Sequence, residues 1–450
     1  MYCHTTDHKQ NIIFNGLTGA INIVDSSIAK ALYENDLKAV VGLNVDVIDG
    51  LKKEGYLFDY QDEEDMLEEK IVELHLDSAA SETSGENITY TFAPTLSCNL
   101  NCFYCFENKV ANRSHRMSLN MLESALEYIG NNKIDNHKSR IELFGGEPLL
   151  NENYAINKRI FEFAKDNSIK VRIVTNGTLI KEQYKLLEDY KSNISMVAIT
   201  LDGLNVSHDA RRHNKKGEGT FDVIINNMEL LLDLGVTVLC RVHVDKPRFP
   251  ELRAIVDFLE AKFMAYSNFS YSFALITNRE KTNSVNQEDL MTEDELAIEL
   301  EQMGIKSNMI TQNAFRILRY LKTILNEEST HLIPSLAFCG ANSGGQVIFA
   351  PDGYLYNCSE AIGIEDLSIG TYHPEIKMFH EQLRRWEYTS VLKLDHCKSC
   401  AVALLCGGGC RLEKYYSSGA VDFTTSDFCD EQLRIINNYL DFYRKKMELL

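Results

Sequence analysis

The stretch TLSCNLNCFYCFE, residues 95–107, contains three cysteines at the spacing C-x3-C-x2-C. Cys98, Cys102 and Cys105 are close enough in the chain for their thiolates to ligate one metal centre. A closed site takes four protein ligands, whereas three leave one position open for a small molecule. The stretch therefore predicts an iron–sulfur cluster with one open iron. A zinc loop that borrows a distant fourth cysteine is the alternative.

This stretch directly follows the first of six β-rich runs that alternate with helical stretches. Repeated strand–helix units predict parallel strands with helices outside, hence an open α/β sheet or barrel. Such folds place their chemistry at the carboxyl ends of the strands, where the cysteine stretch would lie. The β-rich runs are 88–95, 139–146, 170–177, 195–203, 236–244 and 268–276, and the helical stretches include 118–132 and 153–167.

Two further units flank the alternating region. Residues 1–87 contain two short strand-like runs within 11–25 and helical stretches at 26–36 and 44–58, which predict a winged-helix-like unit and a linker. Residues 326–450 contain a predicted hairpin at 344–358, with its turn at 351–353, and a final helix from 429. Helical segments are expected between 292 and 326. The predicted domains are therefore 1–87, 88–325 and 326–450.

Composition and charge limit the class of the protein. The formal net charge of -19 argues against a general nucleic-acid binder, because binding phosphates needs a basic surface. No apolar run approaches the roughly 18 residues of a membrane span, and the N-terminus lacks a signal-peptide pattern. We therefore expect a cytoplasmic protein with neither a nucleic-acid nor a membrane partner.

The twelve cysteines are unevenly distributed. Three lie in 98–105, seven lie between Cys339 and Cys429, and only Cys3 and Cys240 stand apart. In a chain without an export signal, cysteines are more often metal ligands than disulfide partners. The C-terminal spacing is C-x13-G-x4-C from Cys339, then C-x2-C-x5-C-x3-C from Cys397, then Cys429.

The first cysteine motif, with an aromatic residue before its last cysteine, resembles the radical SAM superfamily. The resemblance implies a partial (β/α)6 TIM-like barrel in which Cys98, Cys102 and Cys105 hold a [4Fe–4S] cluster. In that family the open iron chelates S-adenosylmethionine, an electron splits its sulfur–carbon bond, and the 5′-deoxyadenosyl radical removes a hydrogen from the substrate.

The resemblance extends to the expected contacts of the cosubstrate. FGGEP at 144–148 is similar to the family motif that contacts the methionine amino group: Gly145 and Gly146 allow close backbone approach, and Glu147 can accept from an ammonium. Arg212 could reach the carboxylate, or it could belong to a solvated basic run. The other implied contacts are Asn176, Thr200 and Asp202 at strand ends, and Tyr104 and Phe106 beside the adenine, unless these aromatic residues are core.

The C-terminal spacing resembles the SPASM extension of the same family, which carries two auxiliary [4Fe–4S] clusters. Paired zinc ligands, the alternative, usually flank a longer segment than the run between Cys400 and Cys406. The implied ligand sets are a four-cysteine set (the distal cluster) of Cys397, Cys400, Cys406 and Cys429, and a three-cysteine set (the proximal cluster) of Cys339, Cys358 and Cys410. The three-cysteine set has either an open iron, which we favour, or a ligand borrowed from Cys240 or Cys3. An open iron could bind a substrate cysteine thiolate.

One departure concerns the enzymes that mature anaerobic sulfatases. Those enzymes have an aspartate directly after the last cysteine of the hairpin, whereas here Ser359 and Glu360 follow Cys358. The proposed general base of formylglycine formation is missing from its place, and Glu360 is a candidate substitute.

The resemblance implies a peptide maturase that forms a thioether, from cysteine sulfur to carbon, as in sactipeptides and ranthipeptides. Its substrate would be a ribosomally made precursor peptide whose leader binds residues 1–87, and a flavodoxin or ferredoxin would supply electrons. A stabilising cap is the alternative role for that unit. Carbon–carbon crosslinking and sulfatase maturation are rival reactions. An iron–sulfur electron carrier without catalysis and a zinc-stapled binding module are rivals of other classes.

Overall fold

The computed structural model describes most of the chain. The described residues are 2–5, 11–59 apart from 17, 19 and 35, residue 69, 88–132 apart from 111 and 112, 139–278, 285–305, 336–387, 391–421 apart from 399, and 426–448. Most of the predicted linker before residue 88, and the predicted helical segments after residue 305, lie outside the described residues.

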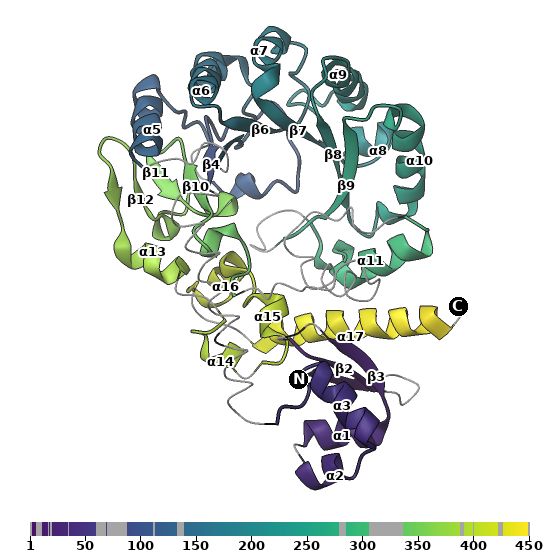
Figure 1. The fold of residues 1–450 in the computed structure, drawn as a ribbon. Helices are drawn as coiled ribbons and strands as arrows, with labels where there is room; N and C mark the ends of the chain where they lie inside the picture. Colours follow the sequence, from purple (N-terminus) through teal and green to yellow (C-terminus); the bar gives the residue numbers. More distant parts are fainter. Residues whose placement is uncertain are drawn as a thin grey trace.

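Six parallel strands form the centre of the molecule (Figure 1). They run in chain order, and each pairs in parallel with the next, which confirms the predicted α/β class and all six β-rich runs. The strands are β4 (Thr89–Phe92), β5 (Arg140–Leu143), β6 (Lys170–Thr175), β7 (Ile194–Leu201), β8 (Val238–Val244) and β9 (Phe269–Leu275).

Helices cover the outer side of this curved sheet (Figure 1). Helix α5 shows why: Ser118 caps its first turn by accepting a hydrogen bond from Met121 N (3.2 Å), and Leu122, Leu126 and Ile129 recur at helical spacing and are buried. The helices of this region are α5 (Leu119–Asn131), α6 (Tyr154–Asp166), α7 (Tyr184–Asp189), α8 (Asn205–Asp209), α9 (Phe221–Asp233), α10 (Leu252–Phe263) and α11 (Glu293–Gln302).

The predicted hairpin forms, and it joins the central sheet. Strands β10 (Gln346–Phe349) and β11 (Tyr354–Tyr356) pair antiparallel around the predicted turn, and β10 pairs in parallel with β4. Strands β12 (Gly370–Thr371) and β13 (Lys377–Met378) continue this edge to a sheet of ten strands. The continuation of the sheet from the alternating region into the cysteine-rich region is not marked by any local pattern in the sequence.

The cysteine-rich region after the hairpin consists largely of short helices. They are α13 (His380–Glu387), α14 (Asp395–Lys398), α15 (Ala403–Cys406) and α16 (Arg411–Ser418). The predicted final helix is confirmed as α17 (Ser426–Glu448). It lies along α11, where Asp294 accepts a hydrogen bond from Asn438 (2.8 Å) and pairs with Arg434 (3.4 Å).

The N-terminal unit is a three-stranded antiparallel sheet with three helices. Its elements are β1 (Tyr2–Thr5), β2 (Asn11–Phe14), β3 (Ile21–Val24), α1 (Ser26–Tyr33), α2 (Leu37–Val41) and α3 (Val45–Lys53); only β1 and α2 were not predicted. Because side chains alternate along β2, Ile13 packs with α1 and α3, whereas Ile12 and Phe14 join the main core. Among the described residues, no helix is long and apolar enough to cross a membrane.

The ring of Phe349 holds the β10 edge to the rest of the sheet. It is fully buried against Phe92 (5.0 Å between ring centroids), Tyr372 (5.2 Å) and Tyr128 (5.6 Å). We expect Phe349→Ala to lower the free energy of unfolding by about 3–5 kcal/mol in urea denaturation, because it leaves a cavity. Met264→Ala, at a side chain that is 52% exposed, should change it by less than about 0.5 kcal/mol. Equal losses would contradict this packing role.

Candidate functional site

The cysteine loop leaves the carboxyl end of β4 and folds back over the sheet. Thr95 forms a bridge with Arg116, and Ser97 Oγ donates a hydrogen bond to the Arg113 carbonyl (2.9 Å). The short helix η1 (Phe106–Lys109) begins directly after Cys105. These contacts position the loop from both of its ends.

The three thiols of the loop lie near one another. Burial, with a smaller contribution from Cys102, raises the pKa of Cys98 to about 11 and of Cys105 to about 12. Burial also raises the pKa of Cys102, and the nearby Arg212 opposes that shift. Burial therefore favours the protonated form of all three thiols, and metal binding would displace their protons.

The two glycines of FGGEP lie directly against the cysteine loop. A Cβ atom on Gly146 would lie 2.2 Å from the Ser97 carbonyl oxygen, and one on Gly145, whose φ is +101°, would lie 2.6 Å from that of Thr95. Gly146 N and Glu147 N donate hydrogen bonds to the same loop carbonyls, at 3.0 and 2.8 Å. Only glycine allows this approach of two backbones.

Glu147 connects the ends of β5 and β6. It is fully buried, and its carboxylate accepts hydrogen bonds from Thr175 Oγ1 (2.7 Å), Asn176 N (2.8 Å) and Leu149 N (2.9 Å). Burial raises the pKa of Glu147, although these hydrogen bonds oppose the shift. The Glu147 carboxylate already accepts hydrogen bonds from two backbone N–H groups and one hydroxyl. A cosubstrate ammonium would have to bind this carboxylate in addition to those donors.

Asn176 continues this network to the cysteine loop. Its amide nitrogen donates to Asn99 Oδ1 (2.8 Å) and lies 3.7 Å from Cys98 Sγ. Its Oδ1 accepts from Thr178 Oγ1 at 2.6 Å. The predicted residues Glu147 and Asn176 are thus brought to one place beside Cys98.

A buried ion cluster lies on the other side of the loop. Asp202 is fully buried beside Arg211 Nε (3.3 Å), His243 Nδ1 (3.5 Å) and Arg212 Nη1 (3.8 Å). Burial would raise the pKa of Asp202, but the hydrogen bond from His243 and the charge of Arg212 hold it below its usual range. Arg212 is 8% exposed, so the alternative of a solvated basic run is wrong for this residue.

Tyr104 contacts both this ion cluster and a small group of apolar side chains. Its hydroxyl oxygen accepts from Arg212 Nη1 (2.5 Å) and lies 3.3 Å from His243 Nδ1, and its ring packs with Ile276 and Val285. His243 and Arg211 were not among the predicted site residues. The signal available was that His243 is a polar residue near the carboxyl end of β8.

The remaining predicted cosubstrate contacts lie at the same edge. Phe106 stacks on Phe144, with ring centroids 6.3 Å apart, directly before the glycine pair. Thr200 lies on β7 two residues before Asp202, hence on the same face of the strand.

Within each of the two predicted sets of C-terminal cysteines, members act on one another's pKa. In the three-cysteine set, burial is the main cause that raises the pKa of Cys339 and Cys358, and the nearby Cys410 adds a smaller increase. In the four-cysteine set, Cys397 and Cys400 act in the same way on Cys406 and Cys429. Among the described residues, no group of three or more His, Cys, Asp or Glu side chains could hold a single metal ion.

Cys240, one of the two spare cysteines, is not brought to the three-cysteine set. Cys240 is fully buried in the core on β8, on the face opposite to His243, and burial alone raises its pKa. The side chain of Cys3 lies outside the described residues.

Lys109 ties the first cysteine loop to the hairpin. Its ammonium donates to the Glu360 carbonyl oxygen (2.6 Å) and to the Tyr416 hydroxyl (2.7 Å). Glu360 is the candidate general base, and its carboxylate lies near Cys358. Burial is the main cause that raises the pKa of Cys358, and the charge of Glu360 raises it further. The first cysteine loop and the three-cysteine set therefore share a packed boundary.

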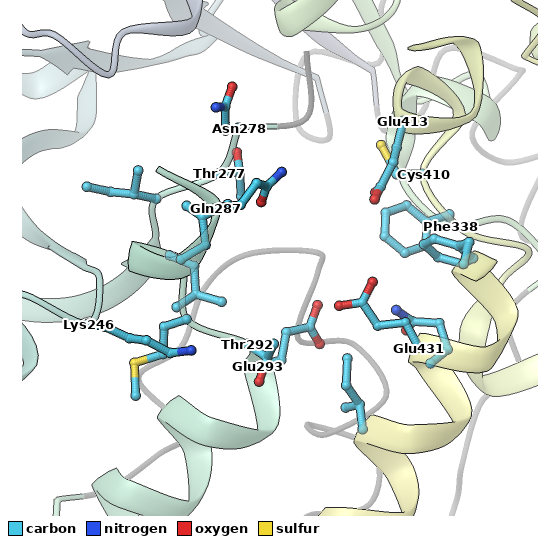
Figure 2. A pocket seen from close by; sticks show the side chains of 17 residues that line it. Lys246, Thr277, Asn278, Gln287, Thr292, Glu293, Phe338, Cys410, Glu413 and Glu431 are labelled. Atoms are coloured by element: carbon cyan, nitrogen blue, oxygen red, sulfur yellow. The ribbon is translucent and has the colours of Figure 1, made fainter. Parts of the chain in front are cut away.

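A pocket of about 410 Å³ lies between the β9 end of the sheet and the cysteine-rich region. Figure 2 shows Cys410, Phe338 and Glu431 facing Thr277 and Asn278 across it. Two more of its lining residues, Ile276 and Leu290, also pack in the cluster that contains Tyr104 and Cys102. The pocket therefore connects the surroundings of the first cysteine loop with one member of the three-cysteine set.

Comparisons with known proteins agree with this geometry. The Radical SAM superfamily model matches residues 92–258. The chain is 24% identical to the radical SAM cyclopropyl synthase TigE of Paramaledivibacter caminithermalis, over 76% of this chain and 72% of that protein. It is 25% identical to a cysteine-type anaerobic sulfatase-maturating enzyme of Clostridium novyi (70% and 86%), and 24% identical to the subtilosin biosynthesis protein AlbA of Bacillus subtilis (84% and 82%).

Solved structures share the fold. The structure of anSMEcpe with bound AdoMet matches with a TM-score of 0.60 and 18% identity, over 81% of this chain and all of that chain. Streptococcus suis SuiB bound to the precursor peptide SuiA matches with a TM-score of 0.55 and 15% identity, over 93% and 96%.

The glycine contact predicts a selective loss of iron. Gly146→Ala would push the cysteine loop away from the end of β5, so we expect less iron bound at Cys98, Cys102 and Cys105 after anaerobic reconstitution. Iron analysis and the electron paramagnetic resonance signal of the reduced cluster measure this. The control is Gly130→Ala on α5, where a Cβ meets nothing within 4 Å. Full iron loading of Gly146→Ala would contradict the prediction.

Proposed function

Since the chain is a radical SAM enzyme with its radical SAM domain at residues 92–258, we propose that it forms a thioether crosslink in a ribosomally made precursor peptide. The relatives support a peptide substrate, because AlbA is named for the biosynthesis of a bacteriocin and SuiB is bound to a precursor peptide. The bond would join a cysteine sulfur to a carbon of the same peptide.

The main support for thioether formation is the position of the three-cysteine set beside the pocket. Cys339, Cys358 and Cys410 supply one ligand fewer than a closed four-iron cluster takes. Cys410 lines the pocket, so a group on an open iron there would face a peptide bound in the pocket. A substrate thiolate is the ligand that suits iron in such a cluster.

The residues present fit the cofactors that this function needs. Cys98, Cys102 and Cys105 would hold a [4Fe–4S] cluster, which supplies the electron that cleaves S-adenosylmethionine. Glu147 and the glycine pair fix the loop against the ends of β5 and β6, and Arg212 places a positive charge beside Cys102. The buried ion cluster around Asp202 keeps that guanidinium charged and in place.

The proposed reaction balances as the loss of a hydrogen pair from the peptide. One hydrogen atom leaves the acceptor carbon for the 5′-deoxyadenosyl radical, and the cysteine thiol releases a proton. When the carbon–sulfur bond closes, the product has to give up one electron, and auxiliary iron–sulfur clusters at the C-terminal cysteines would accept it. An oxidised flavodoxin or ferredoxin finally accepts it.

The N-terminal unit would bind the leader of the precursor. The outer edge of β3 has no strand partner among the described residues, and Ile23 on it is 55% exposed. A peptide can add a strand to such an edge. Because Ile12 and Phe14 pack into the main core, the unit is also held firmly to the enzyme.

Sulfatase maturation is the second candidate function. It is favoured by the similarity to the Clostridium novyi enzyme and to the anSMEcpe fold. The missing aspartate after Cys358 weighs against it, and Glu360 is the residue that would replace that base.

Peptide mass separates these reactions. The reduced, anaerobically reconstituted protein is incubated with S-adenosylmethionine and a cysteine-containing peptide encoded beside its gene. We expect loss of hydrogen pairs together with cysteines that resist alkylation. The same loss with every thiol reactive would contradict a thioether and indicate carbon–carbon crosslinking. Formylglycine in a sulfatase-derived peptide would support the second candidate.

Cysteine variants test whether the first cysteine loop and the three-cysteine set have separate roles in S-adenosylmethionine cleavage and in crosslinking. We expect Cys410→Ala to keep cleaving S-adenosylmethionine but to lose crosslinking, because only the three-cysteine set is damaged. Cys102→Ala should lose both activities, and Cys240→Ala should keep both. Chromatography of 5′-deoxyadenosine and peptide mass are the measurements. Crosslinking by Cys410→Ala, or iron loss in Cys240→Ala, would contradict the open-iron assignment.

A further inference from the structure

One buried histidine holds the backbone of the segment that contains Arg212. Residues 202–220 connect β7 with α9, and His208, on the short helix α8, is fully buried in this connection. Its backbone carbonyl accepts a hydrogen bond from Arg212 N (2.8 Å), and its ring Nδ1 accepts one from Asp202 N (3.2 Å). His208 therefore contacts the backbone of both Asp202 and Arg212, the two residues at the centre of the buried ion cluster.

The other ring nitrogen of His208 reaches the carbonyl side of Arg212 through a hydroxyl. His208 Nε2 lies 3.1 Å from Thr220 Oγ1, and this hydroxyl donates to the Arg212 carbonyl oxygen (2.5 Å). The partners determine the proton positions, because a backbone N–H only donates and a carbonyl oxygen only accepts. Nδ1 is thus the acceptor, Nε2–H donates to Thr220, and both the N–H and the C=O of Arg212 are held.

This arrangement needs a neutral imidazole with one donor and one acceptor nitrogen. Burial lowers the pKa of His208 to about 4, although the charge of Asp202 opposes the shift. The ring of Phe221 packs edge-on against the imidazole, with centroids 5.7 Å apart. The hydrogen bonds from Asp202 through His208 and Thr220 to Arg212 are therefore all present at neutral pH.

The guanidinium of Arg212 keeps one donor for a ligand. Its Nη1 donates to the Tyr104 hydroxyl (2.5 Å) and lies 3.8 Å from Asp202 Oδ1. Its Nε is buried and has no hydrogen-bond partner among the described residues. A buried donor without an acceptor is costly, so this edge of the guanidinium calls for an acceptor from a ligand. A carboxylate matches it in charge and in shape, and S-adenosylmethionine carries one.

We propose that His208 and Thr220 are positioning residues for the cosubstrate, because they fix the Arg212 backbone so that its Nε edge meets the carboxylate of S-adenosylmethionine. Both residues act through Arg212 and touch no substrate. A guanidinium on a fixed backbone loses less conformational freedom when it binds, which strengthens binding. The inference goes beyond the proposed function and needs only that Arg212 contacts the cosubstrate.

The affinity for S-adenosylmethionine tests the proposal without any peptide. Isothermal titration calorimetry on the anaerobically reconstituted, unreduced protein gives the Kd without turnover. Asparagine at 208 places its amide where Nδ1 lies, and glutamine places it where Nε2 lies. We expect His208→Asn, which loses the contact with Thr220, to raise the Kd about five- to tenfold. His208→Gln keeps that contact and should stay within about twofold of the parent.

Thr220 variants test the same connection from its other side. Thr220→Val removes the hydroxyl at nearly constant volume and should raise the Kd as much as His208→Asn does. Thr220→Ser keeps the hydroxyl and should bind like the parent. The double variant with both His208→Asn and Thr220→Val should lose no more affinity than either single variant, because both break one connection.

Decarboxylated S-adenosylmethionine shows whether the loss arises at the carboxylate. This analogue keeps the adenosine and the amino group, so its Kd should be the same for the parent and for the His208 and Thr220 variants. Arg212→Met should weaken S-adenosylmethionine at least as much as His208→Asn does. Equal losses for the analogue and for S-adenosylmethionine would show general damage to the site and would overturn the proposal, as would unchanged binding by Arg212→Met.

Ser207→Ala is the matched control on the same helix. Ser207 directly precedes His208, and its hydroxyl donates to Glu251 Oε1 (2.8 Å) rather than to the Arg212 segment. Its removal should leave the Kd unchanged. An equal loss in Ser207→Ala, or parent-like affinity in both His208→Asn and Thr220→Val, would overturn the proposal. If His208→Asn does not fold, the Kd of Thr220→Val decides alone.

The outcome is separable from that of the proposed function. If the affinities follow the expected pattern but no thioether forms, the inference stands and the proposed reaction fails. If a thioether forms while the His208 and Thr220 variants bind S-adenosylmethionine like the parent, the proposed reaction stands and the inference fails.

Discussion

The parallel pairing of β10 with β4 is the contact on which the arrangement of the cysteines depends. It spans four residue pairs, from Gln346 opposite Thr89 to Phe349 opposite Phe92. Strand β4 leads directly into the first cysteine loop, and β10 lies between Cys339 and Cys358 in the chain. This short ladder therefore fixes where the three-cysteine set lies relative to the loop. Lys109 adds a second connection on the far side of the loop.

The elements that could be predicted from the sequence are those with a strong local pattern. Buried parallel strands give continuous apolar runs, and all six were identified, as was the hairpin with its Asp352–Gly353 turn. The pairing of β10 with β4 could not be predicted, because the residue pattern of a strand does not show which distant strand it pairs with. Strand β1 and helix α2 are too short for a periodicity to be recognised.

The same distinction applies to the candidate site. Cysteine spacing and the glycine pair are local features, and the structure places them together. The sequence could not decide whether Arg212 is solvated or buried, because its environment is assembled from Asp202 after β7 and His243 on β8. His243 was missed for the same reason. Its role arises only where neighbouring strands end side by side.

The two groups of buried charges differ in what compensates them. At the first cysteine loop, Arg211 and Arg212 are neutralised by protein carboxylates, Asp202 and Asp245, so this cluster is complete within the chain. Arg411 and Lys414 are each 1% exposed, and nearby cysteines favour their charged forms, but a cysteine carries charge only when it is deprotonated. The high pKa values that burial imposes on Cys339 and Cys406 make that charge depend on a bound metal centre. The ion cluster at the first cysteine loop is therefore formed by side chains of the chain alone, whereas the charge on the C-terminal cysteines depends on whether their thiols have lost a proton.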